Sequence, residues 1–126
     1  MNDENIEFLS AVKSSIRNND NDLNTSFEYI DCLLTLGADV NIRDDADMGI
    51  LDLIILGCGY HSSLHLERVL KLLDIVLIYK PVMRLNTTVL QSYHSELSFS
   101  ATRANARIAN LVGQCIISEF IRHSGI

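Results

Sequence analysis

The sequence lacks tryptophan and contains few aromatic residues, one proline and three cysteines in 126 residues. Aromatic residues make up 6% of the chain, too few for a platform on which nucleic-acid bases stack. Cys32, Cys58 and Cys115 are too few and too far apart for a disulfide framework, so we expect a reducing compartment. The acidic start at Met1 has no basic and apolar segments of a signal peptide, and we therefore expect a cytoplasmic protein.

Long hydrophobic runs are also missing. The most apolar stretch, residues 72–79, is interrupted by Asp74 and is far shorter than the ~20 residues that a bilayer span requires, so we expect no membrane partner. The chain is 48% apolar and 21% charged, which excludes a disordered acidic tail. These proportions predict one globular domain that covers residues 1–126.

Charge is distributed unevenly along the chain. Residues 1–60 contain 12 acidic and 3 basic side chains, a net charge of −9, whereas residues 61–126 contain 4 acidic and 7 basic ones, a net charge of +3. The basic residues are spread out, and phosphate binding needs a dense basic face, so we expect no nucleic-acid partner. The acidic first part instead favours a protein partner that carries a basic patch.

The sequence resembles itself at an offset of 42 residues, with apolar residues matched to apolar residues. The matched pairs are Leu9 and Leu51, Val12 and Ile54, Phe27 and Val69, Ile30 and Leu72, Leu33 and Ile75, Leu34 and Val76, Leu36 and Ile78, and Val40 and Val82. Within each unit the apolar residues have the spacing of one helix face. At an offset of 39 residues, Leu51 falls on Leu90 and Ile54 on Tyr93, which adds a third unit.

The period predicts an all-α solenoid of about three stacked helix pairs, because one pair alone cannot bury its apolar stripe. We place the repeats at about residues 4–40, 41–82 and 83–123. Gly37 suits the left-handed residue just past the end of a helix, and Pro81 must end the helix before it. The spacing alone is compatible with HEAT-like or ankyrin-like pairs.

Residues 33–44, Leu-Leu-Thr-Leu-Gly-Ala-Asp-Val-Asn-Ile-Arg-Asp, resemble the end of an ankyrin repeat and the start of the next finger loop. The resemblance implies that Gly37 ends an outer helix and that Leu51 is the first buried leucine of an inner helix. Asp52 replaces the histidine that usually follows, and Asp47 stands where the family has a turn glycine. Ankyrin repeats are about 33 residues long, so we expect the extra residues in lengthened loops between paired helices, at residues 18–24 and 57–63.

The resemblance implies a non-catalytic module that recognises another protein through its finger loops, inner helices and inter-helix loops. The candidate contact residues lie in the first finger, the inter-helix loop and the second finger. They are Arg43, Asp44, Asp45, Asp47, Met48, Asp52, Tyr60, His61, Lys80 and Arg84. A solvated turn would account equally well for the aspartates, which favour turns.

The asparagine- and isoleucine-rich repeats look like those of bacterial or viral proteins directed at a host. One family of this kind is the C-terminal ankyrin domain of enteric type III effectors that modify arginine in host caspases. That resemblance implies secretion into the host cytoplasm and a host caspase as partner. An immunity protein that blocks a toxin is the alternative.

Enzyme chemistry is the third and least favoured interpretation. Cys58, His61 and His65 lie close in the sequence and are zinc-ligand types, but a fourth ligand is missing. His94-Ser95-Glu96 has no orienting third group for a catalytic relay. We therefore predict no catalytic residue, no metal and no cofactor.

Overall fold

The computed structural model describes residues 3–17, 23–60 and 63–124, and most of the chain in these ranges is helical. The bounds are α1 Asp3–Arg17, α2 Leu23–Thr35, α3 Ile50–Tyr60, α4 Ser63–Ile78, α5 Thr87–Ser95, the 3-10 helix η1 Leu97–Phe99, α6 Ser100–Ala104 and α7 Ala106–Ser124. The described ranges contain no strand, only an isolated antiparallel bridge between Arg43 and Gly49. The predicted all-α class is confirmed.

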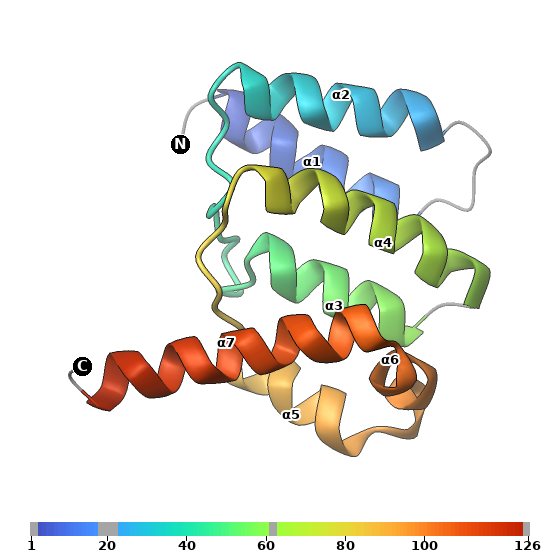
Figure 1. Cartoon of the computed structure of the whole chain (residues 1–126). Helices are drawn as coiled ribbons and strands as arrows, with labels where there is room; N and C mark the ends of the chain where they lie inside the picture. Colours follow the sequence, from blue (N-terminus) through green and yellow to red (C-terminus); the bar gives the residue numbers. More distant parts are fainter. Residues whose placement is uncertain (1–2, 18–22, 61–62, 125–126) are drawn as a thin grey trace.

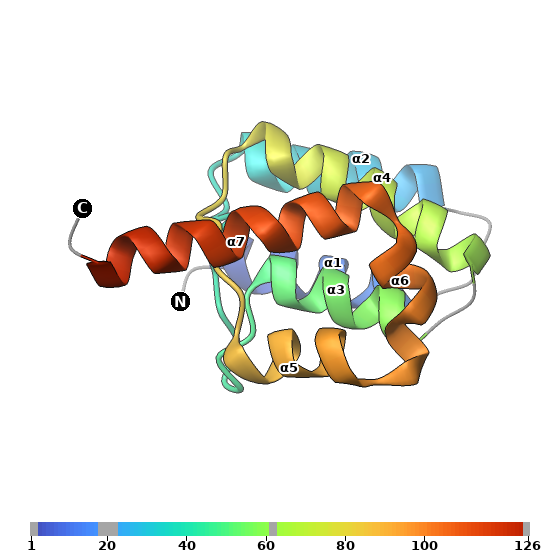
Figure 2. The same ribbon diagram turned by 60° about the horizontal axis from the view of Figure 1, so that its bottom comes forward.

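The first four helices form two hairpins that lie side by side (Figure 1). Helix α1 packs against α2 and α3 against α4, while α1 also contacts α3 and α2 contacts α4. Helix α5 continues the inner row by packing on α3. Helix α7 runs across the last part of the molecule and extends beyond the other helices at its C-terminal end (Figures 1 and 2).

The inner helices bury equivalent positions. Phe8, Ile50 and Val89 are at most 2% exposed, each on the first turns of α1, α3 and α5. The next residues along the chain are the predicted triplet: Leu51 is buried, and Leu9 and Leu90 are partly buried against the same core. The apolar repeat in the sequence therefore corresponds to repeated core positions, with a more buried residue one position earlier in all three helices.

The expected long loop at residues 57–63 is wrong, because α3 extends to Tyr60 and α4 begins at Ser63. Gly57 lies inside α3, where a Cβ atom would come within 2.5 Å of Ile16 Cγ2 on α1. The glycine thus permits close approach of two inner helices. In this unit the residues beyond an ankyrin period lengthen the helices. The connection between α1 and α2, residues 18–22, lies outside the described ranges.

The third unit has additional short helices between α5 and α7. Phe99 of η1 is fully buried, and the Thr102 hydroxyl donates to the Cys58 carbonyl at 3.2 Å. Arg103 Nη1 donates to the carbonyls of Tyr93 at 2.7 Å and Glu96 at 2.9 Å. These contacts fix η1 and α6 against the end of α3. Across the described helices, none combines the length and apolar character needed to span a membrane.

Candidate binding surface

Two segments join successive hairpins: the first link, residues 36–49, follows α2, and the second link, residues 79–86, follows α4. In the first link Gly37 has φ 106°, and its N–H donates to Leu34 O at 3.1 Å while Ala38 N–H donates to Leu33 O at 3.0 Å. This pair of bonds is a Schellman C-cap. The helix end predicted at Gly37 is confirmed.

Asp44 organises the turn of the first link. Its Oδ1 accepts hydrogen bonds from the backbone N–H groups of Ala46 at 2.9 Å and Met48 at 3.0 Å, and its Oδ2 lies 3.2 Å from Lys13 Nζ on α1. Burial alone would raise the pKa of Asp44, but the two backbone donors and Lys13 outweigh it and lower that pKa below its ordinary value. Asp44 therefore ties the first link to α1.

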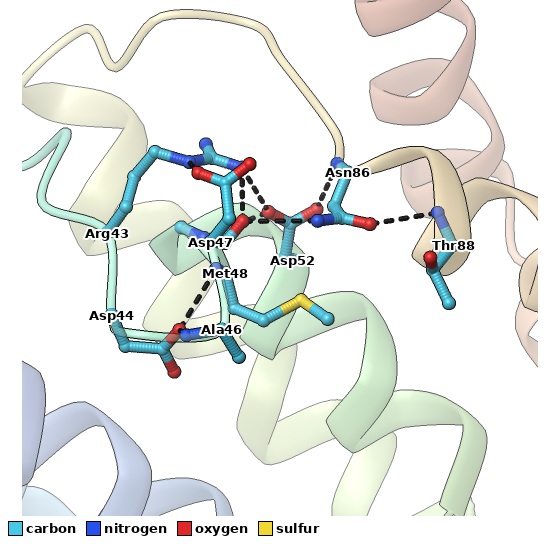
Figure 3. Close-up of polar contacts among 9 residues, drawn as sticks. Arg43, Asp44, Ala46, Asp47, Met48, Asp52, Asn86 and Thr88 are labelled. Atoms are coloured by element: carbon cyan, nitrogen blue, oxygen red, sulfur yellow. Dashed lines mark hydrogen bonds and ion pairs between the residues drawn. The ribbon is translucent and has the colours of Figure 1, made fainter.

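Asp52, on the first turn of α3, joins the two links (Figure 3). Its Oδ2 accepts from Gly49 N–H at 2.9 Å and Arg43 Nη2 at 3.2 Å, and its Oδ1 accepts from Asn86 N–H at 2.7 Å. Burial raises the pKa of Asp52, against the lowering effect of the Asn86 and Gly49 donors and of Arg43. The carboxylate is 0% exposed, so its oxygens are occupied within the fold.

Arg43 and Asn86 complete the connection between the links. Arg43 Nε donates to Asp47 Oδ1 at 2.7 Å, and Arg43 Nη2 donates to the Asp47 carbonyl at 2.6 Å. Asn86 caps α5 by accepting from Thr88 N–H at 2.8 Å, and its amide donates to the Asp47 carbonyl at 3.2 Å. Asp47 has φ 59°, a left-handed conformation that aspartate tolerates better than most residues.

The structure divides the predicted contact residues into three groups. Asp45, Asp47, Lys80 and Arg84 are exposed, whereas Arg43, Asp44 and Met48 are half-buried, with Met48 packed against the core. The prediction that Asp52 contacts a partner is wrong, because its side chain is completely buried. The Tyr60 side chain and His61 lie outside the described part of the structure.

Two surface hollows, of about 420 and 370 Å³, flank the Lys13–Asp44 ion pair and share both residues. We call their combined lining the inner groove: it lies between α1, α3 and the first link. Its lining residues are Ile6, Leu9, Lys13, Ile16, Arg17, Asp44, Asp45, Ala46, Leu53, Leu56 and Gly57. Sequence reasoning missed Ile6, Leu53 and Leu56, although Leu53 and Leu56 fall one helical turn apart on the most apolar helix.

Two of the three cysteines, Cys58 and Cys115, are buried. Burial raises the pKa of Cys58 to about 12, and burial followed by the charge of Asp52 raises the pKa of Cys115 to about 12, so both are protonated at neutral pH. Cys32, by contrast, is exposed. Among the described residues no three potential ligands group around a metal site, and His61 falls outside them.

Comparison with protein-family models, with curated proteins and with solved structures gave no match.

Proposed function

We propose that the chain is an ankyrin-like array of three units that acts as a non-catalytic protein-recognition module. The stacked hairpins, the inner row of α1, α3 and α5, and the projecting turn of the first link support this interpretation. The observation that carries it is the inner groove, a partly apolar hollow divided by one ion pair and bordered by the exposed carboxylate of Asp45.

The lining of the inner groove supports a partner with apolar and basic side chains. Ile6 is 51% exposed and Leu53 and Leu56 are partly buried, so the two hollows offer places for two apolar side chains. Asp45 and Asp47 lie on the adjacent turn of the first link, and most of the acidic residues belong to residues 1–60. A segment with apolar anchors flanked by lysine or arginine fits this surface.

The ankyrin resemblance makes a host protein, with a caspase as one candidate, the first partner to test, and a bacterial toxin the second. Both fit the same groove chemistry, since each need only offer a basic patch with apolar anchors. The gene context separates the two, because an immunity protein is encoded beside its toxin.

The experiment compares protein capture by two charge-matched variants. Ile6→Glu places a carboxylate in the groove, whereas Leu97→Glu places one on η1, where Leu97 is 86% exposed. Both sites are open to solvent, so we expect both variants to fold, as circular dichroism would verify. Proteins captured by the wild type and by Leu97→Glu but lost with Ile6→Glu support the proposal. Equal capture by all three chains excludes the groove as the binding site.

Charge reversal tests the electrostatic part. Asp45→Arg should slow association with the captured protein and weaken its dependence on ionic strength, because it removes a charge that attracts a basic partner. Glu67→Arg, an exposed reversal on α4, is the matched control. Equal association rates for the two variants would show that the acidic turn does not direct binding.

A further inference from the structure

Helix α7 has two opposite apolar faces. Ile108, Leu111, Val112 and Cys115 are at most 4% exposed and pack on the core. At 3.6 residues per turn, Ile116, Ile117, Phe120 and Ile121 point away from that face, with exposed fractions of 43%, 60%, 70% and 44%. We call these four residues the α7 outer face.

The α7 outer face is unusual for an amphipathic helix, whose face away from the core is usually polar or charged. Its four side chains present roughly 400 Å² of apolar surface, within the range of about 300–600 Å² of the largest patch on a typical monomer, which often serves a function. The C-terminal half of α7 also extends past the other helices in both views, so a partner can approach it freely (Figures 1 and 2).

We infer that this face binds a second copy of the chain through an antiparallel pair of α7 helices. A two-fold axis between Ile116 and Ile117 sets each of these residues against the other in the second copy. The same axis sets Phe120 against Gly113, which lies two turns earlier on the same face. A Cβ atom at Gly113 would meet nothing within 4 Å, so the glycine leaves room for the incoming ring.

The available area agrees with a modest dimer. A standard interface buries about 800 Å² per partner, and the four apolar side chains supply roughly half of it. The exposed residues Ala109, Asn110 and Gln114 border the patch and supply further, mostly polar surface. An interface that is about half apolar matches the composition of ordinary protein contacts. The face carries no charged side chain, so the pairing incurs no repulsion between like charges.

Sedimentation as a function of concentration tests the dimer. We expect the wild-type chain to pass from monomer to dimer between about 1 and 100 µM, as suits a contact at the small end of stable interfaces. Phe120→Glu and Ile117→Glu should each raise the dissociation constant at least tenfold, since each would bury an unpaired carboxylate. Leu97→Glu, at a leucine of η1 that is 86% exposed, should leave the dissociation constant unchanged. A wild-type chain that stays monomeric at every concentration overturns the inference. That result is expected if a different protein or a lipid surface covers the patch.

Two further variants test the geometry. Gly113→Leu should weaken the dimer at least tenfold by filling the space for Phe120, while the monomer gains thermal stability because glycine is a poor helix former. In a Cys32→Ala background, Ile117→Cys should form a disulfide-linked dimer, since this position lies beside the axis. Gly113→Cys should not, because two turns separate it from its own copy by about 10 Å along the helix. Equal cross-linking of both cysteines would indicate a parallel pair of helices and contradict the antiparallel arrangement.

Discussion

The two links connect the same kinds of helices in different ways. The first uses fourteen residues, residues 36–49, with a glycine cap, a bridge and a turn held by Asp44, whereas the second uses only the eight residues 79–86, with a single tight turn in which Arg84 N–H donates to Val82 O at 2.9 Å. They are nevertheless joined side by side: Asn41 Oδ1 accepts from Val82 N–H at 2.8 Å, and Asp52 bonds to both. The comparison shows that Asp52 holds the two links together and Asp44 holds the first link to α1, whereas the Asp45 and Asp47 side chains lie on the surface.

Removing the Asp52 carboxylate, which bonds to both links, should lower the stability of the chain more than any other change considered below. We expect Asp52→Ala to lower the free energy of unfolding by about 3 kcal/mol or more, because it leaves the backbone N–H groups of Gly49 and Asn86 without their acceptor and removes the buried ion-pair partner of Arg43. Urea unfolding followed by circular dichroism measures the change. Asp45→Ala, on the exposed turn, is the control and should change stability by less than about 0.5 kcal/mol. Similar values for both variants would mean that Asp52 does not join the links.

Asp44 acts on the first link alone, so its effect should be smaller and dependent on pH. Because the folded-state pKa of Asp44 lies below its ordinary value of 3.8, its stabilisation is complete above that value and is lost as pH falls through the folded-state pKa. We expect Asp44→Asn to unfold about 1 kcal/mol more easily at pH 7, in the range of a charged hydrogen bond and a partly exposed ion pair. The difference should shrink steadily in unfolding curves taken from pH 5 down to pH 2. A difference that is constant with pH would contradict the role of the ionised carboxylate.

The sequence predicted the helix pairs because the apolar stripes are dictated by core packing, as Leu9, Leu51 and Leu90 show by lying in or against one core. It also predicted the glycine cap, since only few residues adopt the backbone conformation of Gly37 without strain. It could not predict that Asp52 is buried, because a carboxylate in an apolar helix resembles a contact residue. The hydrogen-bond donors that allow its burial come from two segments that are distant in the sequence. The α7 outer face was missed as well, since exposed and buried isoleucines have the same periodicity.

The ends of α2 and α4 offer the finest test of the difference between the links. The left-handed residue is Gly37 in one and Lys80, with φ 52°, in the other, 43 residues apart and not 42. Lys80 N–H donates to Leu77 O at 3.1 Å, as Gly37 does to Leu34 O, but Pro81 has no N–H to repeat the bond made by Ala38. Helix α4 therefore ends with one capping hydrogen bond fewer than α2, and the residue after it, Lys80, has a strained backbone.

Exchanging the residue types should move stability in opposite directions. Gly37→Ala should cost about 1 kcal/mol, because a Cβ atom is strained at positive φ, and Lys80→Gly should add up to about 0.5 kcal/mol by relieving that strain, partly offset by the greater entropy of the unfolded glycine. A Cβ atom at Gly37 would meet nothing within 4 Å, so the loss of stability in Gly37→Ala measures backbone strain without a steric clash. Thermal unfolding of the two variants and of the double variant measures both effects. If Lys80→Gly also destabilises the chain, contacts of the Lys80 side chain must contribute more stability than its left-handed backbone costs. The two links would then differ in more than their capping hydrogen bonds.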